Sequence, residues 1–177
     1  MGLGVSRATE KSEQRNSQAP LQTGRGFFIA RIGKKRTEAV KNKVVAIVGA
    51  TGAVGREFIG CIESRGIDIK ALKLLASARS AGKTYPFRGK DLVVEELTDD
   101  SFNGVDIALF SAGSGISKQY APIAVKAGAV VVDNSSAFRA DPAIPLVVPE
   151  INARRIQDHK GIIANPNCSA ITTLVPL

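Results

Sequence analysis

The feature that most constrains this chain is a short apolar strand that runs into a glycine turn, K-V-V-A-I-V-G-A-T-G-A-V-G-R at residues 43–56. Its five consecutive apolar residues, Val44–Val48, are too few to cross a membrane and are typical of a strand buried on both faces of a parallel sheet. A strand that ends on a glycine turn and opens a helix directs free N–H groups and the positive end of the helix dipole to one point. The stretch therefore predicts a pyrophosphate site at Gly49, Gly52 and Gly55.

The residues after this turn support that interpretation. The glycine spacing, G-x-x-G-x-x-G, is one residue longer than the usual dinucleotide fingerprint, and a glycine triplet by itself indicates little. However, Val54, Phe58, Ile59 and Ile62 recur at helical spacing and predict a helix with one apolar face that ends near Gly66. A buried strand followed by such a helix favours an α/β domain with a Rossmann-like, doubly wound, mostly parallel sheet. The alternative is a tight turn that binds no ligand.

The positive charge of the chain is concentrated at its N-terminal end. The 177 residues carry a net charge of +8, and residues 1–43 hold ten Lys or Arg and three Asp or Glu, which leaves +1 for the rest. This tail is polar and lacks sustained periodicity, so residues 1–43 are predicted to be disordered and residues 44–177 to form an incomplete NAD(P)-binding domain. Apart from Phe27 and Phe28 the tail has no aromatic residues for base stacking, which argues against nucleic-acid binding.

The tail also bears on the compartment. Its Arg and Ser content is typical of a transit peptide, whereas Glu10, Glu13 and Glu38 are not, and an upstream start codon is the other explanation. No apolar run suits a secretory signal, and no membrane association is expected. Two cysteines, Cys61 and Cys168, make no disulfide framework and suit a reducing compartment. Cytoplasm is the simplest expectation, and a plastid is the alternative.

The second predicted strand, residues 67–76, ends where such a fold meets the adenosine ribose of a dinucleotide. An NAD site usually has Asp or Glu there to accept from the 2′-hydroxyl, but this chain has S-A-R-S at 77–80. A guanidinium at Arg79, flanked by the hydroxyls of Ser77 and Ser80, suits a 2′-phosphate and predicts NADP rather than NAD. The alternative is a loop arginine that only faces solvent.

The remaining elements follow from apolar runs and turn residues. Small residues at Ser111, Ala112 and Gly113, at the end of a strand, would let a ligand approach the backbone, unless they only form a flexible loop. The expected elements are a hairpin or loop at 83–91, strands at 92–97, 105–110, 129–132 and 161–164, a helix at 120–127 capped by Gly128, an extended segment at 142–149, a short helix at 151–158 and a helix-like run at 170–177.

Three further polar residues bear on the functional site. Arg139 follows the strand at 129–132 and is expected on the same sheet edge as the glycine turn, as an anchor for an anion or simply as a loop arginine. His159 is expected to be an exposed loop residue rather than a catalytic base. Cys168 is expected in the first turn of a helix, where free N–H groups stabilise a thiolate and raise its nucleophilicity, whereas Cys61 is expected to act as a small hydrophobe.

A reactive thiol beside a nicotinamide site suggests a specific reaction. The sulfur of Cys168 would attack an acyl carbon, and hydride would pass between the covalent intermediate and the cofactor. An aldehyde would be oxidised to a thioester that phosphate releases, or an acyl phosphate would be reduced in the reverse direction. A non-catalytic nucleotide-binding module with an inert cysteine is the alternative.

Six blocks in this order resemble the aspartate-β-semialdehyde dehydrogenases: G-A-T-G-A-V-G, A-S-A-R-S-A-G, D-I-A-L-F-S-A-G, V-V-D-N-S-S-A-F-R, P-L-V-V-P-E-I-N and N-P-N-C-S. They span most of residues 44–177. The N-acetyl-glutamyl-phosphate reductases share the architecture and a reactive cysteine, but the blocks resemble them less.

The resemblance implies NADPH-dependent reduction of L-aspartyl-4-phosphate to L-aspartate 4-semialdehyde and phosphate, in the diaminopimelate route to lysine and in threonine and methionine biosynthesis. It implies Cys168 as the nucleophile, Thr51, Gly52, Ala53 and Val54 with Arg79 and Ser80 as NADP contacts, and Arg139 with Asn167 as phosphate contacts. No metal is implied.

The resemblance also implies a second domain after Leu177, with further catalytic residues and most of a homodimer interface. Without it, apolar surface would be exposed near the last strands. The chain alone is therefore expected to bind NADP weakly and not to turn over.

Overall fold

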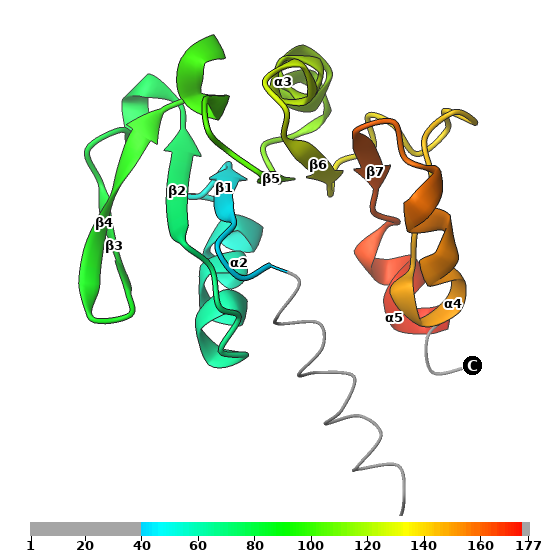
Figure 1. Cartoon of the computed structure of the whole chain (residues 1–177), viewed down its shortest axis with the longest axis horizontal. Coiled ribbons are helices and arrows are strands. Elements are labelled where there is room, and N and C mark those ends of the chain that lie inside the picture. The colour runs from blue at the N-terminus through cyan, green and yellow to red at the C-terminus, as the bar shows by residue number, and fades with distance from the viewer. Residues whose placement is uncertain (1–39, 175–177) are drawn as a thin grey trace, which may run out of the picture.

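The computed structural model of the chain describes residues 40–174, which form a seven-stranded sheet in the order β3-β4-β2-β1-β5-β6-β7 (Figure 1). Every neighbouring pair is parallel except β3 and β4. The strands are β1 Val44–Val48, β2 Ala71–Ala76, β3 Thr84–Phe87, β4 Lys90–Glu96, β5 Ile107–Phe110, β6 Val130–Asp133 and β7 Ile162–Ala164. The α-helices are α2 Ala53–Ser64, α3 Ser114–Lys126, α4 Pro149–Asn152 and α5 Cys168–Leu174, and the 3-10 helices are Ala78–Ser80, Asp99–Phe102 and Ala153–Asp158.

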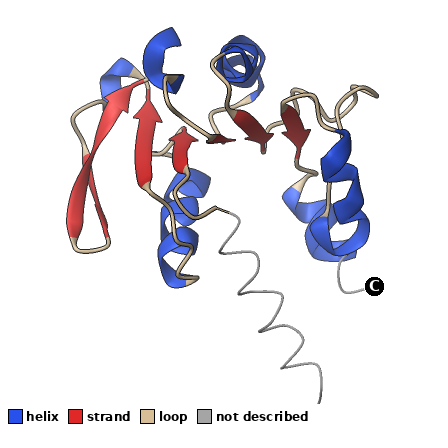
Figure 2. Ribbon diagram, in the orientation of Figure 1, coloured by secondary structure: helices blue, strands red, loops and turns tan. Residues whose placement is uncertain are grey.

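The central strand, β1, is buried on both faces, as its unbroken apolar run predicted. Val45 and Ile47 pack in one cluster with the α2 residues Ile59 and Ile62. Ala46 and Val48 pack in a second cluster on the opposite face, with residues of α3. In Figures 1 and 2, α2 accordingly lies below the row of strands and α3 above it. The predicted Rossmann-like, doubly wound sheet is confirmed.

The chain reverses its direction of travel across the sheet at β1. It moves from β1 to β2 and the β3–β4 hairpin on one side, and then returns to place β5 on the other side of β1. The carboxyl ends of β1 and β5 therefore adjoin where the strand order reverses, which is where open α/β sheets bind their ligands.

Two sequence expectations about α2 are wrong. Val54 was expected on the buried face but is 41% exposed, and Cys61 was expected to pack as a hydrophobe but is exposed. Successive helical residues are about 100° apart, so the neighbours of Gly55 and Ile62, which do face the sheet, point away from it. Phe58, as expected, is partly buried against the same cluster.

Several helix boundaries differ from the sequence expectations. The helix expected to begin at Tyr120 begins at Ser114, because Gly113 takes a φ of 90° as its N-cap and the small residues after it form the first turn; Pro122 lies inside the helix. Helix α4 begins at Pro149, a favoured first helical residue, and α5 begins at Cys168 rather than at 170.

The hairpin is confirmed, with its turn at residues 88 and 89, both of positive φ.

Apolar side chains are exposed near the last strand, as expected. Leu146, Ile151 and Ile156 are 39%, 62% and 38% exposed. They belong to the segment between β6 and β7, and Leu146 also forms an isolated parallel bridge to Ala164 of β7. The outer side of β7 is therefore only partly paired within residues 40–174.

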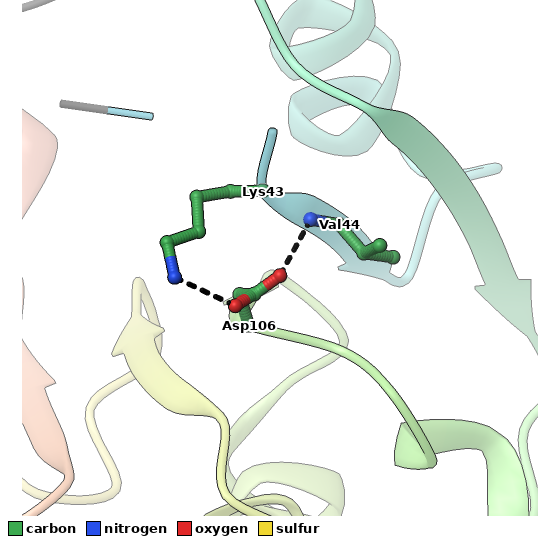
Figure 3. Close-up of polar contacts among 3 residues, drawn as sticks. All are labelled: Lys43, Val44 and Asp106. Atoms are coloured by element: carbon green, nitrogen blue, oxygen red, sulfur yellow. Dashed lines mark hydrogen bonds and ion pairs between the residues drawn. The ribbon is translucent and has the colours of Figure 1, made fainter. Parts of the chain in front are cut away.

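At the amino-end edge of the sheet, one carboxylate ties β1 to β5 (Figure 3). Asp106 accepts 2.8 Å hydrogen bonds from Lys43 Nζ and from the Val44 backbone N–H. The Lys43 hydrogen bond and then the Val44 N–H hold the pKa of Asp106 below its ordinary value. The pair lies on the edge opposite the glycine turn, so we assign it to stability.

We expect Asp106→Asn to remove one acid-dependent part of the stability. Because the pKa of Asp106 is lower in the folded chain, its contribution is present above the unfolded value of about 3.9 and is lost as pH falls through the folded value. Urea unfolding between pH 3 and pH 7 should show a smaller pH dependence for Asp106→Asn than for the parent. An unchanged slope with pH would contradict the assignment.

Two glycines in α2 should respond oppositely to alanine. A Cβ at Gly55 would overlap the carbonyl oxygen of Gly49, whereas a Cβ at Gly60 would meet nothing within 4 Å. We expect Gly55→Ala to destabilise the domain by about 1–3 kcal/mol through overpacking, and Gly60→Ala to stabilise it by about 0.5–1 kcal/mol through helix propensity. Urea unfolding of the two variants measures this, and equal effects would refute the packing argument.

Candidate functional site

The turn after β1 and the turn after β5 touch through their backbones. Gly49 has a φ of 87°, and a Cβ there would lie 2.6 Å from the carbonyl oxygen of Ser111 and 3.0 Å from the Ala112 nitrogen. Side chains other than hydrogen cannot occupy that space, so Gly49 serves both the turn conformation and the contact. Because of this contact, the first turns of α2 and α3 lie close together at the carboxyl ends of the neighbouring strands β1 and β5.

The glycine turn presents several backbone donors. The N–H groups of Gly49 and Ala50 bind the Leu75 carbonyl, and that of Gly52 binds the Gly49 carbonyl. The N–H groups of Thr51 and of residues 53–55 make no hydrogen bond to any other residue between 40 and 174. Ala53 and Val54 are exposed and Thr51 is half-buried, so their free amides can receive an anion, whereas Gly55 is buried. This geometry fits the pyrophosphate of a dinucleotide.

The residues after β2 lie beside the glycine turn, because the N–H groups of Gly49 and Ala50 bind the carbonyl of Leu75 near the end of β2. Ser77 and Arg79 are exposed, and residues 77–80 include no carboxylate, although Glu96 of the neighbouring strand β4 pairs with Ala76 at the same end. Ser80 differs from the expectation of an accessible hydroxyl: it is 8% exposed at the end of the 3-10 helix Ala78–Ser80. Arg79 and Ser77 are therefore the side chains available to a 2′-phosphate.

The loop after β5 contributes a second helix start. Ser111 and Ala112 are half-buried against the glycine turn, and Gly113 is exposed and caps α3. The structure shows Gly49 approaching the backbone of Ser111 and Ala112, and the expected approach of a ligand to these residues stays a prediction. The helix starts of α2 and α3 thus flank one point on the edge of the sheet.

Arg139 follows β6 on the same carboxyl-end edge, as expected, but its guanidinium is already partly engaged. Nε donates to the Asn165 carbonyl and Nη2 to the Asn134 carbonyl, each at 2.9 Å. Nη1 makes no hydrogen bond to another described residue. Arg139 also lines a pocket of about 440 Å³ with Asp141, Asn152 and Arg155, and neither Asn167 nor Cys168 lines it.

Cys168 is the first residue of α5, so it lies in the first helical turn and is exposed, as the sequence predicted. Asn167 precedes it, and its side-chain oxygen accepts from the Ser169 N–H at 2.8 Å, so Asn167 caps the helix. Strand β7, which leads into this turn, is parallel to β1 and three positions away in the sheet, roughly 14 Å at the usual strand spacing. Cys168 thus lies on the same edge as the glycine turn, and both cysteines of the chain are exposed.

His159 is half-buried, and its Nδ1 accepts from the Gly161 N–H at 3.0 Å. Among residues 40–174, no group of three or more His, Cys, Asp or Glu side chains is arranged to hold a metal ion. No helix in the described part is long and apolar enough to cross a bilayer.

The sequence reasoning missed a buried polar network at the end of β6. It treated Asp133 as part of a polar loop, but Asp133 is the last residue of the strand and is 0% exposed. Its carboxylate accepts hydrogen bonds from Ser117 of α3 at 2.6 Å and from Ser135 at 2.7 Å. Strand alternation could have revealed it, because Asp133 shares a face with Val131, which packs in the cluster beneath α3.

Comparisons with known proteins agree with this geometry. The model for "Semialdehyde dehydrogenase, NAD binding domain" matches residues 44–159. The chain is 53% identical over 133 residues to aspartate-semialdehyde dehydrogenase of Bacillus subtilis, covering 75% of this chain and 38% of that protein. It therefore spans less than half the length of that relative.

Solved structures show the same relationship. Aspartate semialdehyde dehydrogenase II from Vibrio cholerae, complexed with ASA, matches with a TM-score of 0.74 and 50% identity over 76% of this chain and 45% of that one. Aspartate semialdehyde dehydrogenase from Candida albicans, with NADP, matches with a TM-score of 0.64 and 29% identity over 76% of this chain and 45% of that one.

Proposed function

The chain belongs to the semialdehyde dehydrogenase family through its NAD-binding domain, and from this premise we propose that it is the cofactor-binding part of an aspartate-semialdehyde dehydrogenase. The complete protein would reduce L-aspartyl-4-phosphate with NADPH to L-aspartate 4-semialdehyde and phosphate. The observation that carries this proposal is the placement of a dinucleotide-type glycine turn and an exposed cysteine on one edge of the sheet.

The residues at the switch point fit an NADP molecule. The free amides at Thr51, Ala53 and Val54 would bind the pyrophosphate, and the close contact between Gly49 and Ser111 holds the starts of α2 and α3 on either side of it. Arg79 and Ser77 would bind the 2′-phosphate, since residues 77–80 supply a guanidinium and a hydroxyl and no carboxylate. Ser80 would support this loop from its buried position rather than bind the cofactor.

The chemistry follows from the thiol. The Cys168 thiolate would attack the acyl carbon of the acyl phosphate, forming a C–S bond as the C–O bond to phosphate breaks and phosphate leaves. NADPH supplies a hydride to the thioester carbon. Collapse of the resulting thiohemiacetal, with one proton taken up, releases the aldehyde and regenerates the thiol.

Arg139 and Asn167 would serve the departing phosphate. Nη1 of Arg139 makes no hydrogen bond to another described residue, and the guanidinium borders a pocket. Asn167 uses its side-chain oxygen to cap α5, which leaves its amide N–H₂ to donate to an oxyanion beside Cys168.

The relatives reported above favour the aspartyl substrate over N-acetyl-glutamyl phosphate. We propose catalysis, a homodimeric state and a cytoplasmic location for the complete protein only, because this chain spans 38% of the Bacillus subtilis relative. A plastid location stays the alternative if the tail is a transit peptide.

NADP binding tests the cofactor assignment. We expect Arg79→Ala to weaken NADP binding by about 10- to 100-fold, the range for one or two charge-assisted hydrogen bonds, and to leave NAD binding within twofold. Arg65→Ala, at the far end of α2, is the matched control and should change neither. Isothermal titration with each nucleotide measures this. Equal losses for NADP and NAD would refute the 2′-phosphate assignment.

Alkylation separates an enzyme from a non-catalytic module with an inert cysteine. Since both thiols are exposed, access does not favour either one. We expect iodoacetamide at pH 7 to modify Cys168 on the order of tenfold faster than Cys61, because only the thiolate reacts. Peptide mass spectrometry with time measures both rates in one sample, and equal rates would support the inert module.

A further inference from the structure

We propose that the buried Asp133 is a positioning residue that holds the segment leading into Cys168, through a set of hydrogen bonds that we call the β6–β7 clamp. The clamp comprises Asp133, Asn134, Ser135, Arg139 and Asn165, and Ser117 anchors Asp133 to α3 from outside it. The inference rests on the proposed function only in taking Cys168 as the reactive thiol.

The clamp begins in the core. Asp133 and Ser117 are both 0% exposed, and their 2.6 Å hydrogen bond joins the end of β6 to α3. The second carboxylate oxygen accepts from the Ser135 hydroxyl, which itself accepts from the Ala137 N–H at 3.0 Å. A buried carboxylate is costly unless it is hydrogen-bonded, so this arrangement strongly constrains the loop after β6.

The loop after β6 then binds Asn165, the residue that follows β7, through hydrogen bonds. The Asn134 side-chain oxygen accepts from Asn165 Nδ2 at 2.6 Å. Arg139 Nε donates to the Asn165 carbonyl, and the Asn165 N–H donates to the Asp133 carbonyl at 2.8 Å. Asn165 is therefore held by its side chain, its carbonyl and its N–H, three residues before the sulfur.

These contacts give Arg139 a role besides anion binding. Its Nη2 donates to the Asn134 carbonyl while Nε binds that of Asn165, so one planar guanidinium bridges the two loops. An anion bound at its remaining nitrogen would act on the same group that holds the thiol-bearing turn. Positions of the anion and of Cys168 are thereby coupled.

Alkylation of Cys168 and Cys61 by iodoacetamide in one sample measures the effect. The readout is the ratio of the Cys168 alkylation rate to the Cys61 alkylation rate at pH 7, both cysteines being exposed. Cys168 is already exposed, so loosening the turn between β7 and α5 cannot make the sulfur more accessible to the reagent. Loosening this turn would instead move away the backbone N–H groups that favour the thiolate. We expect Ser135→Ala and Asn134→Ala each to lower the ratio about threefold, the effect of losing one favourable helix-end interaction.

Matched variants distinguish positioning from general stability. Ser117→Ala removes the other hydroxyl from the same carboxylate but leaves the loop contacts, so it should lower the urea midpoint at least as much as Ser135→Ala while keeping the ratio within twofold. Ser135→Thr retains the hydroxyl and should restore the ratio.

The outcomes are separable from those of the proposed function. If Ser135→Ala and Asn134→Ala leave the ratio unchanged, or if Ser117→Ala lowers it equally, the clamp has no positioning role. If the parent Cys168 reacts no faster than Cys61, the proposed function fails. The clamp is then decided by hydrogen exchange of the Asn165 N–H, which donates to the Asp133 carbonyl and should exchange faster in Ser135→Ala and Asn134→Ala than in Ser117→Ala.

Discussion

The contact between the backbones of Gly49 and Ser111 is the constraint on which the rest of this structure depends. It exists only because residue 49 has no Cβ, and it brings the ends of β1 and β5 together where the strand order reverses. The first turns of α2 and α3 then flank the same point. Amides that have no partner inside the fold are thus gathered where an anionic ligand can use them.

The two edges of the sheet differ in what their residues do: one stabilises the fold and the other carries the candidate site. The amino-end edge carries the Lys43–Asp106 pair, which joins β1 to β5 far from the glycine turn. The carboxyl-end edge carries the glycine turn, Arg79, Arg139 and Cys168, contributed by the loops after four strands. Parallel strands make this division possible, since all their carboxyl ends emerge on one side and each loop can vary without disturbing the core.

Local patterns predicted the elements well where they depended on burial alone. The buried strand β1 and the place of Cys168 in a first helical turn follow from neighbouring residues, whereas the sequence did not decide between a hairpin and a loop at residues 83–91. The patterns failed where a side chain could take either of two faces. Val54 and Cys61 fit an apolar helix face by type, but the sheet lies against Gly55, Ile59 and Ile62, and no local rule decides which stripe is covered.

The sequence by itself determined the fold class, the turn at Gly49 and the residue types on the carboxyl-end edge, because strand burial, glycine conformation and thiol chemistry are properties of short stretches. Only the tertiary structure decided that Asp133 is a buried acceptor and that Arg139 donates two of its nitrogens to backbone carbonyls. It also decided that Ser80 is buried while Arg79 is exposed. The partner of Asp133, Ser117, is 16 residues away, and one partner of Arg139, Asn165, is 26 residues away. Spacing along the chain does not encode which distant groups meet.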